Sequence, residues 1–394
     1  MQIKTNRIQS IDVLRGLAMV IMALDHVRDY TNTSYLFGDP TNLDTTTPAL
    51  FFTRWITHFC APIFVFLAGT SAFLYGSKTS KKDLSKFLFT RGIWLVFTEL
   101  TVVNLAWTFD VSLSLHIFQV IWAIGICMMF LAGLIYLPKK LLLALGLLIV
   151  IGHNSLDSIT MQGNNPLSVL WYFVHQQNFV SLNNGESLMF IAYPFLPWLG
   201  IMICGYCFGY FYQRDFDTAT RKNWLLLFSF GSIFIFVLLR SMNIYGDLAP
   251  WNTHDSSVFS FLSFLNTTKY PPSLLYTLMT IGPAMFFLYF IESVKNIATN
   301  MLAVIGRVPF FYYILHLYLI HFISLIGLAF LGEDWKELIL TPARFNSGYL
   351  LGKGFDLWVT YLIWLLVVLI LYPFCKMFAQ YKANNKDKWW LSYL

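Results

Sequence analysis

The chain has 394 residues, of which 57% are hydrophobic and only 12% are charged, and its formal net charge is +6 at pH 7. Soluble domains carry about twice that charged fraction, so the composition excludes an ordinary soluble protein and indicates an integral membrane protein. The excess of Lys and Arg does not indicate nucleic-acid binding, because these residues fall in short clusters between apolar runs.

Ten apolar stretches are long enough to cross a bilayer. They lie near residues 9–30, 50–76, 87–108, 114–137, 141–157, 188–212, 222–243, 272–294, 301–331 and 354–378. The basic clusters between them all fall on one side of the membrane when both termini are cytoplasmic. We therefore predict an all-α, polytopic membrane protein with about ten transmembrane helices, in which residues 1–394 form one domain. The longer loops then form a mouth on the far side.

The first predicted span carries ionisable residues on one helical face. Asp12, Arg15, His26 and Asp29 follow one another at spacings that, with two methionines between them, keep them on one stripe. A face of this kind is too costly to expose to lipid, so it must look into a bundle or a wet cavity. Arg15 and His26 lie about 16 Å apart along the helix axis, roughly half of the bilayer core.

His26 is the first candidate catalytic residue, because an imidazole can take and return a proton near neutral pH. Asp29 lies one turn further on and can orient it, whereas Asp25 points about 100° away. His58, beside Arg54 near the outer mouth, is a second histidine suited to a proton relay. The alternatives are structural: a histidine hydrogen-bonded between helices for His26, and an interfacial side chain for His58.

Several basic residues are candidates for holding an anionic cofactor. Arg15 either pairs with Asp12 or contacts phosphates, for which a guanidinium is well suited. Lys269, in Lys-Tyr-Pro-Pro-Ser, either binds a carbonyl or phosphate oxygen or is an interfacial lysine. Arg91 shares its span with Glu99, a buried carboxylate expected to pair with Arg15 or a protonated histidine.

The ninth predicted span offers a second group. Arg307 is expected near its cytoplasmic end, with Tyr312 and His316 one turn apart and deeper in the membrane. A basic group followed by hydrogen-bonding groups suits a channel for a phosphate-headed cofactor with a thin tail. A packed, aromatic-rich helix explains the same residues. The five cysteines all lie in apolar segments and are interpreted as packing residues, so neither a disulfide framework nor a metal site is predicted.

These motifs resemble a known superfamily. Asp12, Arg15, Gly16 and His26 resemble the opening of transmembrane acyltransferases, and the spacing from Arg15 to His26 is similar to that of the membrane acyltransferase-three family, which O-acetylates surface sugars. A longer series resembles the bacterial relatives of heparan-alpha-glucosaminide N-acetyltransferase. It comprises residues 62–71, 91–94, 193–200 with Gly205 and Gly209, 269–276 and 306–316.

The resemblance implies an enzyme of the bacterial cytoplasmic (inner) membrane. Such an enzyme takes an acyl group, here an acetyl group, from cytosolic acyl-CoA and delivers it to a sugar or glycan on the far side, without a metal. The resemblance then implies that Arg15 lies on the side where the cofactor binds and His26 on the side where the acceptor binds. The eukaryotic enzyme uses a histidine in the loop after the first span, but residues 31–49 contain none, which shifts that role to His26 and then to His58.

The expected partners are acyl-CoA, a glycan acceptor and the lipid bilayer, and not nucleic acid. The sequence leaves the oligomeric state open, a homodimer included. The alternative function is a transporter or flippase of a glycan or lipid-linked substrate, in which the polar stripe lines a translocation path without acyl transfer. The lack of a strong internal repeat counts against that alternative.

Overall fold

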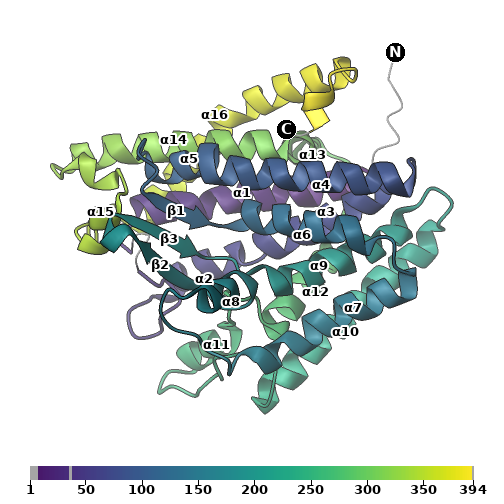
Figure 1. The fold of residues 1–394 in the computed structure, drawn as a ribbon, viewed down its shortest axis with the longest axis horizontal. Coiled ribbons are helices and arrows are strands. Elements are labelled where there is room, and N and C mark those ends of the chain that lie inside the picture. The colour runs from purple at the N-terminus through teal and green to yellow at the C-terminus, as the bar shows by residue number, and fades with distance from the viewer. Residues whose placement is uncertain (1–7, 35–37, 393–394) are drawn as a thin grey trace.

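The fold is an α-helical bundle with one small sheet, and the computed structural model describes residues 8–34 and 38–392 (Figure 1). The helices are α1 (Gln9–Thr31), α2 (Pro48–Thr57), α3 (Cys60–Gly76), α4 (Lys81–Thr98), α5 (Asn104–Thr108), α6 (Val120–Leu134), α7 (Lys139–Gly152), α8 (Pro166–Val174), α9 (Phe195–Phe208), α10 (Thr218–Met242), α11 (Ser257–Leu265), α12 (Leu274–Ile291), α13 (Ile297–Arg307), α14 (Pro309–Phe330), α15 (Pro342–Ser347) and α16 (Leu357–Asn384). The strands are β1 (Leu115–Phe118), β2 (Asn178–Leu182) and β3 (Ser187–Ile191). Short helical turns join several of them, among them η1 (Glu99–Val103) and η2 (His153–Leu156).

Within the described residues, eight helical segments are long and apolar enough to cross a membrane. They are Pro48–Gly76, Lys81–Thr108, Lys139–Leu156, Phe195–Tyr212, Thr218–Met242, Leu274–Ile291, Pro309–Phe330 and Leu357–Asn384. Helix α1 has a comparable length of 23 residues but carries charged side chains, and α6 and α13 are shorter apolar helices. The predicted class, an all-α polytopic membrane protein, is confirmed.

Two predicted spans were wrong at their starts. Residues 115–118 and 187–191 are strands β1 and β3, which pair in parallel with Leu115 opposite Leu188. Strand β2 pairs antiparallel with the other edge of β3, so the order is β1-β3-β2. Short apolar runs of this length do not distinguish a strand from a helix, and only the pairing of distant segments decides between them.

The ninth predicted span is broken into α13 and α14. The break falls at Val308, whose backbone leaves the helical region at φ −132° and ψ 51°. Pro309 is the first residue of α14, a position where the missing N–H of proline costs nothing. Arg307 therefore ends one helix, while Tyr312 and His316 belong to the next.

Helix α1 lies in the interior of the bundle (Figure 1). It packs against α13, α14, α16, α3, α2 and α12, and most of its residues are buried. Its closest approach is to α13, where a Cβ on Gly16 would overlap the backbone of Leu302 and a Cβ on Gly306 would overlap the backbone of Asp12. The charged stripe of α1 therefore faces protein, as its cost in lipid requires.

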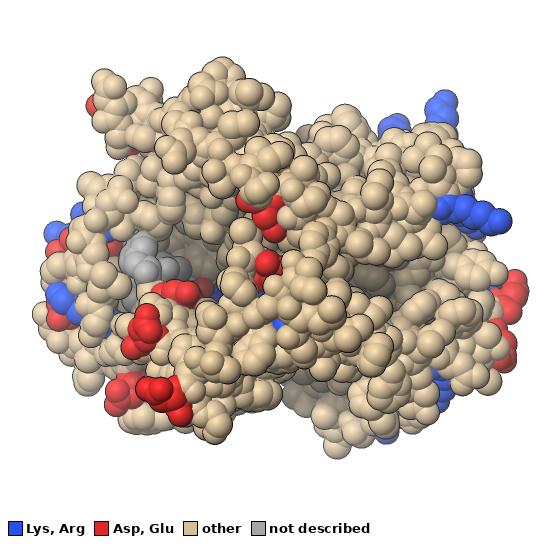
Figure 2. Space-filling model, turned by 90° about the horizontal axis from the view of Figure 1, so that it is seen from below, with Lys and Arg blue, Asp and Glu red and all other residues tan. Residues whose placement is uncertain are grey.

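The longer connections, which contain the three strands, form one end of the molecule, and we call this the sheet end. It holds β1–β3 and the C-terminal end of α1, at the left of Figure 1, whereas α1 begins toward the opposite end. Hydrogen bonds from Thr33 to Phe355 and from Leu340 to Thr108 join segments that are distant in the sequence. Figure 2 shows that most Lys and Arg atoms on the face it presents lie toward the two ends of the molecule.

Candidate active site

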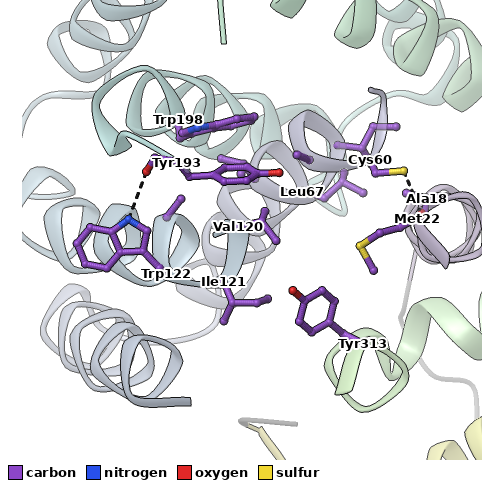
Figure 3. Packing of buried hydrophobic residues seen from close by; sticks show 14 of the residues in the cluster. Ala18, Met22, Cys60, Leu67, Val120, Ile121, Trp122, Tyr193, Trp198 and Tyr313 are labelled. Atoms are coloured by element: carbon purple, nitrogen blue, oxygen red, sulfur yellow. Dashed lines mark hydrogen bonds between the residues drawn. The ribbon is translucent and has the colours of Figure 1, made fainter. Parts of the chain in front are cut away.

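A polar cavity lies among α1, α2, α3 and α6 near the sheet end, with a volume of about 80 Å³. Its walls comprise Met22, Asp25, His26, Asp29, Arg54, Thr57, Cys60, Ala61, Phe64, Trp107, Gln119, Val120, Tyr193, Lys269 and Tyr270. Figure 3 shows how Met22, Cys60, Val120 and Tyr193 approach the same space from different elements. Two hydrogen bonds hold this wall, from the Cys60 thiol to the Ala18 carbonyl and from the Trp122 indole to the Tyr193 carbonyl.

The lining residue His26 makes its closest polar contact with a second buried histidine, His316. His26 Nδ1 lies 2.7 Å from His316 Nε2, and His316 Nδ1 lies 3.0 Å from the Tyr312 carbonyl oxygen. A carbonyl only accepts hydrogen bonds, so Nδ1 of His316 carries a proton and, in the neutral ring, Nε2 accepts one. His26 then donates through Nδ1, which leaves Nε2 of a neutral His26 free to take a proton.

A cluster of buried charges adjoins His26. Asp25 accepts hydrogen bonds from Arg54 at 2.6 Å and from Arg28 at 2.9 Å. Asp29 accepts one from Arg28 at 2.5 Å. These opposite charges compensate one another in the interior, where an unpaired charge would be costly.

Lys269 brings a further positive charge to the cavity from the loop before α12. Lys269 is only 8% exposed, and its Nζ lies 5.1 Å from the centre of the Tyr270 ring. Burial alone would raise the pKa of Tyr270, but Lys269 and Arg54 outweigh that effect and hold the pKa below its ordinary value. This part of the cavity therefore favours negative charge.

Three of the predicted site residues line this cavity, namely His26, Asp29 and Lys269. His316, predicted among the cofactor residues, is instead the hydrogen-bonding partner of His26. Tyr312 stacks on His316 with ring centres 5.3 Å apart. Asp29 was expected to orient His26, but the structure places its carboxylate on Arg28.

His58 does not lie among the lining residues of the cavity. Its ring is buried, 5.5 Å from the ring of Tyr276, whose hydroxyl donates to the His58 carbonyl at 2.6 Å. This position joins α2 to α12 inside the protein and differs from the interfacial side chain considered as the alternative.

The other predicted cofactor residues lie away from His26. Arg15 donates to Ser71 at 2.8 Å and to the Gly306 carbonyl at 3.2 Å, near the start of α1. Arg307 contacts Asp12 at 3.8 Å through a side chain that is 43% exposed. Arg91 lies on α4, 5.8 Å from the Phe87 ring centre. Arg15 and Arg307 thus form a basic pair at the opposite end of α1 from His26.

The prediction that Glu99 pairs with Arg15 or a protonated histidine was wrong. Its carboxylate accepts hydrogen bonds from the backbone N–H groups of Gln119 at 3.0 Å and Trp122 at 3.3 Å, and the structure gives it no contact with Arg15 or a histidine. These are amides at the start of α6, where unsatisfied donors and the helix dipole stabilise negative charge. Glu99 therefore anchors the N-terminus of α6 beside the cavity.

Sequence reasoning missed several residues of the cavity wall. Asp25 was expected to point away from His26, yet it lies on the wall and pairs with Arg54. A cavity that spans several helices admits side chains from more than one stripe of α1. Trp107 carries no local signal, and Tyr193 stood out only as the first residue of the motif 193–200. Segments distant in sequence bring both to the cavity.

Comparison with known proteins gives the family of the chain. Residues 7–247, more than half of the chain, match the family model of the heparan-alpha-glucosaminide N-acetyltransferase catalytic domain. No curated protein matches the chain. The match includes α1 and its stripe, whereas His316 lies beyond it. The chain therefore belongs to the heparan-alpha-glucosaminide N-acetyltransferase catalytic family, a family of membrane acetyltransferases.

Proposed function

We propose that the protein moves an acetyl group from cytosolic acetyl-CoA to an amino or hydroxyl group of a sugar or glycan on the extracytoplasmic side of a bacterial cytoplasmic membrane. The observation that supports it best is that His26, on the wall of a polar cavity in the bundle, is hydrogen-bonded to the buried His316. Both termini are then cytoplasmic, so the sheet end faces outward.

His26 acts as the general base of this reaction. As the acceptor nitrogen or oxygen attacks the thioester carbonyl, its proton passes to His26 Nε2 while His316 holds the ring through Nδ1. A bond from the acceptor to the acyl carbon forms, the carbon–sulfur bond breaks, and the coenzyme thiolate leaves and takes up the proton. Lys269 contributes positive charge where the carbonyl oxygen becomes negative.

The donor is held from the other end of α1. Arg15 and Arg307 lie on that side, and Arg307 is exposed enough to contact phosphates. Arg15 and His26 are eleven residues apart on one helix, about 16 Å along its axis. The extended arm of the coenzyme is the part suited to bridge this separation, with its nucleotide on the basic pair.

Turnover by the purified protein tests the proposal. The protein in lipid nanodiscs is given acetyl-CoA and a glucosamine-terminated oligosaccharide, and free coenzyme thiol and acetylated product are measured. His26→Ala is expected to lower the turnover number about 10²- to 10⁴-fold, the usual contribution of a general base. The matched control, His254→Ala, removes an exposed histidine and should keep full activity.

Two results would contradict this function. Full activity of His26→Ala would exclude the mechanism. Movement of the glycan across sealed vesicles in the absence of acetyl-CoA, without acetylated product, would favour a flippase instead.

A further inference from the structure

A second cluster of polar side chains lies outside the His26 cavity, where α7 passes into η2. His153 Nδ1 lies 3.2 Å from His175 Nε2, and His175 Nε2 lies 3.7 Å from Asp157 Oδ1. All three ligand atoms lie within 4.8 Å of one another. Two nitrogens bound to a tetrahedral zinc ion are roughly 3.3 Å apart, because each lies about 2.0–2.1 Å from the metal. The cluster therefore already has nearly the spacing of a metal site.

The oxygen that faces this cluster has no hydrogen-bond partner. Asp157 Oδ1 is buried and accepts no hydrogen bond, its contact with His175 Nε2 is 3.7 Å long, and the side chain is only 10% exposed. The second oxygen, Oδ2, accepts a hydrogen bond from the Asn154 amide at 2.8 Å, which fixes the direction of the carboxylate. A buried carboxylate oxygen is costly without a donor or a cation. An ion among the three side chains removes that cost.

The surroundings hold the carboxylate of Asp157 in place through Asn154. Asn154, which holds Asp157, also accepts a hydrogen bond from the Leu274 backbone at 2.9 Å.

We propose that His153, Asp157 and His175 bind one divalent transition-metal ion of the zinc class. Two imidazole nitrogens and one carboxylate oxygen favour such an ion over Mg²⁺ or Ca²⁺, which take oxygen ligands. Three protein ligands leave a fourth tetrahedral position for water. This inference departs from the sequence analysis, which predicted no metal site, since a loop and helix α8 separate His175 from His153 and Asp157.

The ion has a specific structural consequence for the loop that carries Lys269. Asn154, the partner of its ligand Asp157, accepts a hydrogen bond from the backbone N–H of Leu274 at the start of α12. The bound ion therefore ties the end of α7 to the segment 269–274, and holds Lys269 and Tyr270 at the cavity.

Metal content tests the site independently of acetyl transfer. Protein freed of its purification tag is saturated with Zn²⁺, passed through a desalting column and analysed by elemental mass spectrometry. The expected result is one equivalent of zinc, with binding weakened at least about 100-fold in Asp157→Asn and His175→Ala. His254→Ala, which changes an exposed histidine, should keep the full equivalent. Gel filtration and helical circular dichroism show that each variant is folded.

Cobalt substitution reports the geometry. One equivalent of Co²⁺ should give the intense visible bands of a tetrahedral site in the natural protein, and these bands should be absent from Asp157→Asn. Hydrogen exchange of residues 268–274 should slow when Zn²⁺ is added to the natural protein and stay unchanged in that variant. Zinc content below a tenth of an equivalent, or equal content in His175→Ala, would overturn the proposal.

Discussion

At the scale of single residues, the proposed chemistry depends on which nitrogen of His26 carries the proton. The Tyr312 carbonyl accepts a hydrogen bond from Nδ1 of His316, so Nε2 of His316 accepts one from Nδ1 of His26. Nε2 of His26 therefore carries no proton and can accept one. Since His316 lies outside the family match, its pairing with His26 rests on the tertiary structure alone.

His316→Ala tests this positioning role. The substitution removes the acceptor of His26 Nδ1, so the ring is no longer held in one orientation and tautomer. We expect the turnover number to fall about 10²-fold, with little change in KM for acetyl-CoA. In a His26→Ala background the same substitution should cost less than about threefold, because the partner it positions is already gone. An equal loss in both backgrounds would show that His316 acts independently of His26.

Asp25 tests the buried charge cluster. Asp25→Asn leaves Arg54 and Arg28 without their shared carboxylate, and removal of one partner of a buried ion pair costs about 3–5 kcal/mol. We expect a clear fall in the midpoint of thermal unfolding, measured in detergent micelles. Asp44→Asn, at an exposed carboxylate, is the control and should leave the midpoint unchanged. Equal midpoints for the two variants would contradict the role of Asp25.

At the scale of elements, the crossing of α1 with α13 holds the basic pair in place. Gly16 and Gly306 let the two backbones touch, so that Arg15 on α1 reaches the Gly306 carbonyl at the end of α13. The break at Val308 then lets α14 begin separately and carry His316 to His26.

Gly306→Ala should separate these two helices. Its Cβ would overlap the Asp12 backbone, which no side-chain rotation can relieve. We expect a destabilisation of about 1–3 kcal/mol from overpacking, together with a higher KM for acetyl-CoA as Arg15 loses its position. Gly133→Ala, in helix α6, meets no atom within 4 Å and should be neutral in both measurements. A neutral Gly306→Ala would show that the helices can slide apart without cost.

At the scale of the whole molecule, the proposed reaction requires that the two ends of α1 face different compartments. Cysteine labelling in intact cells tests this orientation. Lys386→Cys follows α16 and His254→Cys lies before α11, and both positions are exposed. A membrane-impermeant maleimide should label the second variant from outside and the first only after the membrane is opened. The reverse pattern would invert the orientation and place His26 on the cytoplasmic side.

The sequence by itself determined the class of the protein. Long apolar runs, low charge and the clusters of Lys and Arg predict a polytopic helical membrane protein, and a stripe of ionisable groups on α1 predicts a buried helix. These conclusions rest on local composition and helical spacing, which can be read from neighbouring residues without knowledge of the tertiary structure. The same spacing selected His26 as the first candidate catalytic residue, which stays a prediction, and the motif series indicated the family that the family model confirms.

Only the tertiary structure decided which residues meet. Strands β1 and β3 need each other to form, so neither short apolar run could be distinguished from a helix in isolation. His26 and His316 are separated by 290 residues, and so no local pattern predicts their contact. The cluster of His153, Asp157 and His175 likewise depends on how a loop folds back onto α7. Side chains from distant segments come together because they pack well and because their charges compensate one another in three dimensions. The spacing of residues along one helix contains no information about either effect.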